Sequence, residues 1–302
     1  HAVMRPCMHS PTTKYIDGAL YARSLTPYAF DLRVHDLGHG HVEATALPRY
    51  GWHEIDATPE ALATAALAQG HVWAGGEVCD WVPAPAPTEA ELLDRAARNR
   101  ERSARRARTQ VRRLVKAKNL DTMLTGTYRE NVTDRERLSR DVDVFIKRVR
   151  RVIPGFEYVC VFERQKRGAW HFHMAVQRVQ SHYLRKGVLV KSYDLLRALW
   201  RAVVGDGNID VSRAIRKRQR STGKLAGYLS KYIAKGFEEG QEGDSYRASG
   251  KALPKPVVLR SLATSADGAG TDLLRLLMAF FPDGEFHSAY LDCGGYYMAL
   301  SP

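Results

Sequence analysis

Two histidines one residue apart, His171 and His173, are the side chains of this sequence best suited to metal chemistry. They lie in the segment 157–177, EYVCVFERQKRGAWHFHMAVQ, which predicts two strands joined by a tight charged turn at 165–168. Alternate residues of a strand point to the same face, so both imidazoles should project from one side of a sheet. The residues in phase on the other side are apolar and are expected to be buried: Phe172, Met174 and Val176.

A third ligand for this site is available near the end of the preceding strand. If the two strands form a hairpin, the carboxylate of Glu163 reaches the face that carries His171 and His173. Imidazole and carboxylate ligands with open positions suit Mg²⁺ or Mn²⁺ acting as a Lewis acid, and Zn²⁺ is a further option. The alternative on this segment alone is a strand with two surface histidines whose hydrogen bonds are satisfied by the protein or by water.

Composition and charge indicate a globular protein with a polyanionic partner. The 302 residues carry a net charge of +13, and hydrophobic residues make up 44%. Residues 1–90 hold five basic and ten acidic side chains, and residues 91–302 hold 41 basic and 23 acidic ones. We expect no membrane span, no signal peptide and no small-molecule cofactor, and the four scattered cysteines fit reduced thiols.

The uneven charge suggests three segments. We predict a small N-terminal accessory domain with a Pro-rich linker over 1–87, a catalytic domain over 88–262 that starts with a basic helix, and a C-terminal extension over 263–302. Residues 95–118 contain eleven Arg or Lys and one acid, and a second basic run, RAIRKRQR, covers 213–220. The helix is either a solvated surface element or a phosphate-contacting arm, and the overall charge favours the arm. The expected DNA contacts are Arg105, Arg106, Arg108, Arg112, Arg113, Lys116, Arg216, Lys217, Arg218 and Arg220.

A pair of tyrosines supplies candidate nucleophiles. The segment 224–237, KLAGYLSKYIAKGF, predicts a helix on which Tyr228 and Tyr232 lie four residues apart and therefore on one face. Lys231 and Lys235 neighbour them at the same spacing. A metal that withdraws charge from a phosphodiester, a tyrosine oxygen that attacks it, and lysines that hold the phosphate together describe covalent strand transfer. Two half-buried aromatic residues on a packed helix are the structural alternative.

Three motifs in this order resemble the HUH endonuclease superfamily, specifically the rolling-circle replication initiators of single-stranded DNA phages and related plasmids. The motifs are LTGTY at 124–128, HFH at 171–173 and YLSKYIAK at 228–235. The duplicated Tyr-x-x-Lys form is similar to initiators with two active tyrosines, such as the phage gene A proteins. Gly126 departs from the bulkier residue expected in the first motif. The resemblance covers about residues 95–262.

The resemblance implies an α+β fold, with a central antiparallel sheet and flanking helices related to the RNA-recognition fold. It also implies that the protein nicks single-stranded DNA at an origin through a 5′-phosphotyrosine and later rejoins strands, with Tyr228 and Tyr232 as nucleophiles. The expected partners are origin DNA and, because no GxxxxGK[ST] motif occurs, a host helicase and polymerase. The expected location is the cytoplasm of a bacterial host. A transposase or relaxase of the same superfamily, and a non-catalytic origin-binding protein, are the alternatives.

Overall fold

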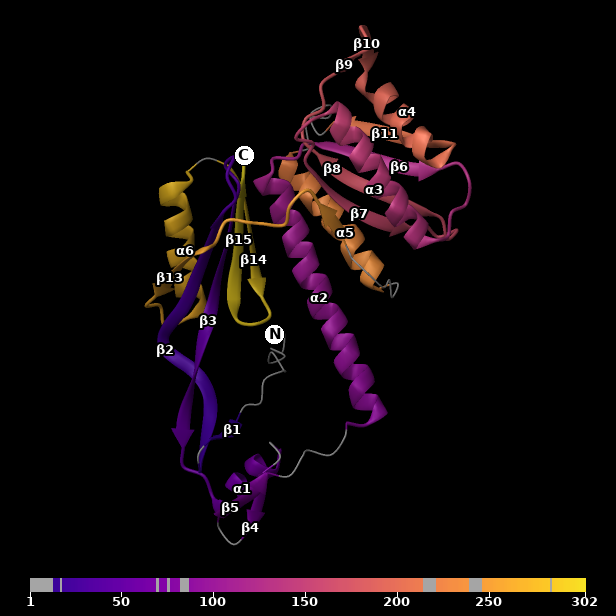
Figure 1. Cartoon of the computed structure of the whole chain (residues 1–302). Coiled ribbons are helices and arrows are strands. Elements are labelled where there is room, and N and C mark those ends of the chain that lie inside the picture. The colour runs from indigo at the N-terminus through magenta and orange to yellow at the C-terminus, as the bar shows by residue number, and fades with distance from the viewer. Residues whose placement is uncertain are drawn as a thin grey trace. The chain divides into compact units, whose positions relative to one another are not determined.

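The computed structural model describes residues 13–16, 18–68, 71–74, 77–81, 87–213, 221–238, 246–282 and 284–302 (Figure 1). Contacts along the chain divide it into two compact units. The first unit comprises residues 1–36, 42–93 and 255–301, and the second comprises mainly residues 94–254. The candidate metal ligands and both candidate nucleophiles belong to the second unit.

The first unit is built on a six-stranded antiparallel sheet with the order β1-β2-β3-β15-β14, in which β13 also pairs with β2. Helix α6 packs its buried leucines on this sheet, and a separate hairpin and α1 complete the described part of the unit. The elements are β1 (Thr13–Ile16), β2 (Ala19–Asp36), β3 (Val42–Ile55), α1 (Pro59–Ala68), β4 (His71–Ala74), β5 (Glu77–Trp81), β13 (Val257–Ser261), α6 (Ala266–Phe280), β14 (Glu285–Leu291) and β15 (Gly295–Ser301).

The C-terminal segment is part of the first unit's sheet. Strand β15 pairs along its length with β3, and the hydrophobic core contains Leu273 and Leu277 from α6 beside Val42 and Ala44 from β3. The residues 263–302, expected as an extension, therefore complete a sheet that begins more than 200 residues earlier in the chain. The three-segment division of the chain stays a prediction.

The second unit contains a five-stranded antiparallel sheet with the order β11-β6-β8-β7-β12. The predicted histidine hairpin is present as β7 and β8, at the centre of this sheet. The elements are α2 (Glu89–Ala117), β6 (Thr122–Tyr128), α3 (Arg135–Val152), β7 (Tyr158–Arg164), β8 (Trp170–Val176), β9 (His182–Arg185), β10 (Val188–Lys191), α4 (Ser192–Val204), β11 (Gly207–Arg213), α5 (Thr222–Glu238) and β12 (Tyr246–Ala248).

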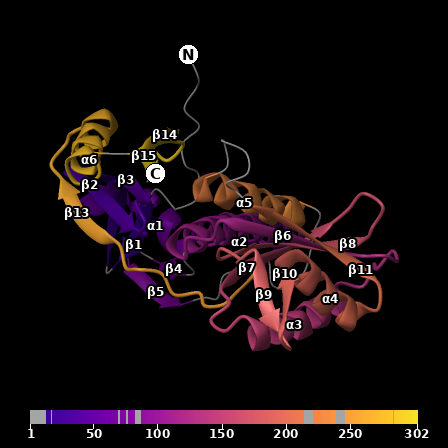
Figure 2. The same ribbon diagram turned by 90° about the horizontal axis from the view of Figure 1, so that it is seen from above.

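Helices cover both faces of this sheet, with α2 and α5 on one side and α3 and α4 on the other (Figure 2). The α3/α4 face is filled by an aromatic cluster in which the rings of Phe172 and Trp200 lie 5.2 Å apart, with Phe145 between α3 and both of them. A Cβ added to Gly126 would lie 2.0 Å from the ring of Phe172. The glycine that departs from the family pattern is therefore explained, because the aromatic ring occupies the space of its side chain.

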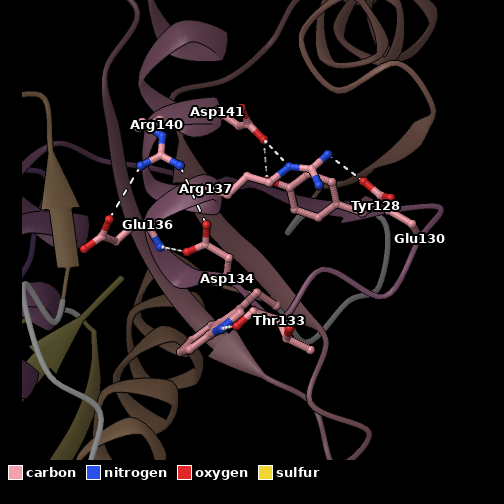
Figure 3. Close-up of polar contacts among 9 residues, drawn as sticks. Tyr128, Glu130, Thr133, Asp134, Glu136, Arg137, Arg140 and Asp141 are labelled. Atoms are coloured by element: carbon pink, nitrogen blue, oxygen red, sulfur yellow. Dashed lines mark hydrogen bonds and ion pairs between the residues drawn. The ribbon is translucent and has the colours of Figure 1, made fainter.

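The start of α3 is fixed by polar contacts (Figure 3). Asp134 caps the helix by accepting a hydrogen bond from the backbone N–H of Glu136 at 2.8 Å. Arg137, one turn further on, reaches back to Glu130 at 2.5 Å, and the hydroxyl of Tyr128 donates to Asp141 at 2.8 Å. These contacts tie the end of β6 to α3, which completes the wall of the aromatic cluster.

The prediction of an α+β fold with a central antiparallel sheet and flanking helices is confirmed. Sequence reasoning did not identify the hairpin β9–β10, the short strand β12, or the small elements β4 and β5. The basic run at 214–220 and the linker at 83–86 lie outside the described residues. In the part of the chain that the structure describes, no helix combines the length and apolar character needed to cross a membrane.

Candidate functional site

The histidines lie where strand alternation places them. In the ladder of β7 and β8, His171 is opposite Glu163 and His173 is opposite Val161. Phe172, Met174 and Val176 enter the core on the α3/α4 face, while Ala175, in phase with the histidines, packs on the α2/α5 face. Both histidine side chains are largely buried, each residue being 7% exposed. The imidazoles are thus directed into the layer between the sheet and α5.

Both ring nitrogens of His173 have partners. Nδ1 lies 3.2 Å from the hydroxyl of Thr125 on β6, and Nε2 lies 2.8 Å from Oε2 of Glu163 on β7. His173 is opposite Thr125 in the ladder of β6 and β8, so this contact follows from the register. Such contacts on both sides fix the orientation of an imidazole ring, which is the usual role of groups that support a metal-binding histidine.

Glu163 is held by two donors. Its Oε1 accepts a hydrogen bond from Lys235 Nζ at 2.8 Å, in addition to the contact of Oε2 with His173. Lys235 also donates to the backbone carbonyl of Arg164 at 3.4 Å. Burial of the carboxylate acts to raise its pKa, but the hydrogen bonds from His173 and Lys235 outweigh burial and hold the pKa at about 2. Glu163 is therefore a carboxylate at all physiological pH values.

His171 differs from His173 in having no side-chain hydrogen bond to the described residues. Burial lowers its pKa below the ordinary value, which favours the neutral imidazole with a free lone pair. A buried imidazole without a protein partner, opposite a carboxylate in the ladder, has the properties of a metal ligand.

The two tyrosines of α5 lie directly above this group. The ring of Tyr232 stacks on His173, with centroids 4.2 Å apart and planes 18° from parallel, and the Tyr228 ring lies 6.4 Å from the same histidine. The hydroxyl of Tyr232 donates a short hydrogen bond to the hydroxyl of Tyr228. Burial, followed by this hydrogen bond, raises the pKa of Tyr232 above its ordinary value. Tyr228 is the more accessible phenol, with 42% of the residue exposed.

The apolar face of α5 explains this placement. Leu225, Ala226, Leu229 and Ile233 pack against α2 and the sheet, and the neighbouring stripe of the helix carries Tyr228, Tyr232 and Lys235 over the ends of β7 and β8. Side chains separated by more than fifty residues along the chain therefore meet at one place: Glu163, His173, Tyr228, Tyr232 and Lys235.

Residues 121–237 match the model of a family described as Replication-associated protein ORF2. This stretch runs from β6 to α5 and contains every side chain of the cluster just described. It covers less than half of the 302 residues, and no curated protein and no solved structure matches the chain. This part of the chain is similar to replication-associated proteins, which supports a Rep-like protein with a role in replication.

The metal ligands predicted for this Rep-like region fit a divalent cation in kind, since two imidazoles and a carboxylate are suitable donors. They do not form a ready cage: no group of three or more His, Cys, Asp or Glu side chains among the described residues is placed to hold a metal ion. Instead, Glu163 is bound by His173 and Lys235. A cation at this place would be held by His171, His173 and Glu163.

The remaining predicted residues are spread more widely. Arg105, Arg106 and Arg108 are exposed on α2, and Arg105 pairs with Glu101 at 2.6 Å. Arg112 and Arg113 are partly exposed, whereas Lys116 is only 4% exposed and is turned into the layer beneath the helix. Lys231 is exposed and lies outside the cluster. The predicted contacts at Arg216, Lys217, Arg218 and Arg220 lie outside the described residues.

Sequence reasoning named Thr125 only as a hydroxyl near the site, and the structure gives it a definite partner, His173. The signal that could have identified it is the register. Strands β6 and β8 pair so that a hydroxyl-bearing residue is opposite a histidine.

Proposed function

We propose that the protein initiates rolling-circle replication by nicking single-stranded DNA at an origin, forming a 5′-phosphotyrosine intermediate, and later rejoining strands. The observation that carries the proposal is the convergence of Tyr228 and Tyr232 with His173 and Glu163, from helix and sheet, at one place. The match of residues 121–237 to a replication-associated family supports the same biological role.

Tyr228 is the first nucleophile in this proposal. Its oxygen accepts the hydrogen bond that Tyr232 donates, so negative charge that develops on Tyr228 is stabilised, and its exposure admits a DNA strand. The oxygen of Tyr228 attacks the phosphorus and its proton passes to solvent. The bond from phosphorus to the 3′ oxygen breaks, and the released 3′ oxygen takes up a proton and serves a polymerase as primer.

Tyr232 carries out the second transfer. Burial raises its pKa, so it remains a protonated hydrogen-bond donor while Tyr228 is the nucleophile. Once Tyr228 is esterified, a second strand entering the site can be attacked by Tyr232, and a free 3′ hydroxyl can attack the first ester to rejoin the strand. Stacking on His173 holds the second phenol within reach of the same phosphate.

His171, His173 and Glu163 would hold a divalent cation, Mg²⁺ or Mn²⁺, next to the scissile phosphate. The bound cation would supply Lewis-acid stabilisation of charge on the phosphate oxygens. Thr125 would keep the ring of His173 oriented, and Lys235 would release Glu163 Oε1 and turn to the phosphate. The exposed arginines of α2 would contact the DNA backbone, and a host helicase would supply unwinding.

The test is covalent capture of DNA. A pool of random-sequence single-stranded oligonucleotides labelled at the 3′ end is incubated with the protein and Mn²⁺, and adducts that survive denaturing electrophoresis are isolated and sequenced. A 5′-phosphotyrosine keeps the 3′ label on the protein. We expect adducts in Mn²⁺ or Mg²⁺, none with a chelator, and none from the Tyr228→Phe/Tyr232→Phe double variant. Tyr290→Phe, an exposed tyrosine of the first unit, is the matched control and should retain full yield.

A non-catalytic origin-binding protein is the second candidate, because Glu163 is bound by Lys235 and the described residues contain no ready metal cage. Such a protein would enrich a defined sequence from the same pool, with a steep dependence on salt, and would form no adduct with any divalent metal. Adduct that persists in the double tyrosine variant would instead show that another residue is the nucleophile.

A further inference from the structure

A cavity of about 380 Å³ lies between the β9–β10 hairpin, the first turns of α4 and strand β11. It is lined by Ser181, Lys191, Tyr193 and Arg197, among others, and none of these residues belongs to the tyrosine and histidine cluster. Cavities of this size are typical of sites that hold small ligands or parts of larger ones. In Figure 1 the hairpin and α4 lie next to one another at one end of the second unit.

Positive charge accumulates around this cavity without acidic partners. Residues 177–201 contain six Arg or Lys and a single acid, Asp194. Arg197 is only partly exposed, its Nε is buried, and that atom has no hydrogen-bond partner among the described residues. A buried guanidinium nitrogen without a partner is costly unless a ligand completes its hydrogen bonds. This observation points to an anionic ligand.

An aromatic ring stands among these cations. Tyr193 is 41% exposed, Arg197 lies 5.6 Å from its ring centroid, and Lys191 Nζ lies 6.0 Å from it on the same hairpin-to-helix junction. An accessible ring beside two cations matches the chemistry of a nucleotide, because a base can stack on the ring while its phosphates meet the positive charges.

The backbone at this junction adds donors. Lys191 is the N-cap residue of α4 and makes no side-chain capping hydrogen bond, while the N–H of Ser192 donates to the carbonyl of Ser181 at 3.0 Å. The remaining amides of the first turn therefore lack a side-chain cap. Helix N-termini attract phosphate through these amides and through the helix dipole, so this feature strengthens the same preference for an anion.

The one acidic residue on the cavity wall does not offset these charges. Asp210 lies on β11 opposite Thr125, whose side chain contacts His173 on the α2/α5 face. Its neighbours Ile209 and Val211 belong to the α3/α4 core. Since side chains alternate along a strand, Asp210 lines the cavity with its backbone and directs its carboxylate to the other face.

A second cavity of about 460 Å³ continues from the first. The two share Ser181 and His182 in their walls, and the second is lined further by Arg178, Gln180 and Leu189. Basic, hydroxyl and amide groups therefore follow one another from Arg197 to Arg178. This arrangement suits a strand longer than one nucleotide, with a phosphate near each end of the track.

We propose that this track, lined by Arg178, Ser181, His182, Lys191, Tyr193 and Arg197, binds single-stranded DNA, with a base stacked on Tyr193 and phosphates on Arg197 and Lys191. The inference rests on the proposed function only in taking single-stranded DNA as the substrate. The site lies on the α3/α4 side of the sheet, and the candidate tyrosines lie on the α2/α5 side. It would therefore hold the strand away from the point of cleavage and contribute to binding without touching the reacting phosphate.

The test compares two ligands by fluorescence anisotropy, with the full chain and with a chelator present to prevent strand cleavage. One ligand is oligothymidylate, and the other is an abasic oligonucleotide of equal length, which keeps the phosphates but has no bases. Tyr193→Ala should weaken binding of oligothymidylate by about tenfold, within the range measured for stacked bases, and leave the abasic ligand unaffected. Tyr193→Phe, which keeps the ring, should bind both ligands like the wild type.

Arg197→Ala should weaken binding of both ligands and reduce the slope of log affinity against log salt by about 0.7, the value for one phosphate contact on a single strand. Arg151→Ala is the matched control, since it removes an exposed charge from α3 that does not line either cavity. Thermal melts of each variant, with midpoints like that of the wild type, would show that the losses do not arise from unfolding.

Unchanged binding in Tyr193→Ala, or an equal loss for both ligands, would overturn the stacking site. A salt slope in Arg197→Ala equal to that of Arg151→Ala would overturn the phosphate contact. Covalent adduct formed by the wild type together with unchanged binding in Tyr193→Ala would remove this inference and leave the proposed function intact. The expected binding losses in a protein that forms no adduct would do the reverse.

Discussion

The two faces of strand β8 differ in what holds them together. On the α3/α4 face, Phe172 is fully buried and packs edge-on against Trp200 at 5.2 Å. On the α2/α5 face, the adjacent His173 is held by Thr125, by Glu163 and by the stacked ring of Tyr232. One side depends on shape and apolar contact, and the other on charge and hydrogen bonds.

The difference shows how a strand can carry a core and a site at the same time. Because alternate side chains point to opposite faces, neighbouring residues of one strand can serve separate purposes. Substitutions on the apolar face should therefore change stability first, and substitutions on the polar face should change DNA chemistry first. Each prediction below could break that separation.

The largest expected change in stability comes from the apolar face. Phe172→Ala should lower the free energy of unfolding by about 3–5 kcal/mol, because the ring fills space between Phe145, Trp200 and Gly126 that nothing else can occupy. Urea denaturation followed by circular dichroism measures this loss. A loss below about 1 kcal/mol would mean that the aromatic cluster does not define the core of this sheet.

The adjacent residue should show the opposite pattern. His173→Gln should lower the yield of covalent DNA adduct by about 100-fold or more, since a group that supports charge at the reacting phosphate is lost. Its loss of unfolding free energy should be smaller than that of Phe172→Ala, because no large apolar volume is removed. Adduct yield per folded protein, corrected by the melt, is the measurement. Equal stability losses in the two variants would contradict the separation of the faces.

The polar face should also show itself in the pH dependence of stability. Glu163 has its pKa lowered from 4.5 to about 2 by hydrogen bonds from His173 and Lys235. A lowered pKa contributes stability above the unfolded-state value, and that contribution is lost as the pH falls from about 4.5 towards 2. Glu163→Gln should therefore be less stable than the wild type by about 2 kcal/mol at pH 7.

The measurement is the difference in unfolding free energy between wild type and Glu163→Gln across this pH range. The difference should shrink steadily below pH 4.5. A difference that is constant from pH 7 to pH 3 would show that the loss comes from packing rather than from ionisation. Asp94→Asn, which alters an exposed ion pair on α2, serves as a control for general effects of charge.

Much of the second unit could be predicted because its patterns are local. The hairpin of β7 and β8, the helices α3, α4 and α5, and the separation of Phe172 from His171 and His173 all follow from periodicities of two and 3.6 residues. The spacing of Tyr228 and Tyr232 likewise fixed their common face on α5. These features need no knowledge of distant contacts.

The features that were not predicted depend on long-range pairing. The exposed hairpin β9–β10 has apolar residues without a buried face, so its sequence lacks the usual alternation of a half-buried strand. The pairing of β15 with β3 joins segments about 250 residues apart, and no local signal encodes that distance. The salt bridge between Lys235 and Glu163 depends on how α5 packs over the sheet, which is equally non-local.

Gly126 offers the smallest and most specific test of the apolar face. Its register partner on β8 is Phe172, and an added Cβ would lie 2.0 Å from that ring, so Gly126→Ala must displace it. We expect a loss of about 1–3 kcal/mol, the usual range for overpacking a core. If the ring is the cause, the combination Gly126→Ala/Phe172→Leu should lose less than the sum of the two single changes, because a smaller side chain leaves room for the methyl group. Strictly additive losses would place the strain in the backbone of β6, and the glycine would then reflect strand geometry rather than the aromatic packing that separates the two faces.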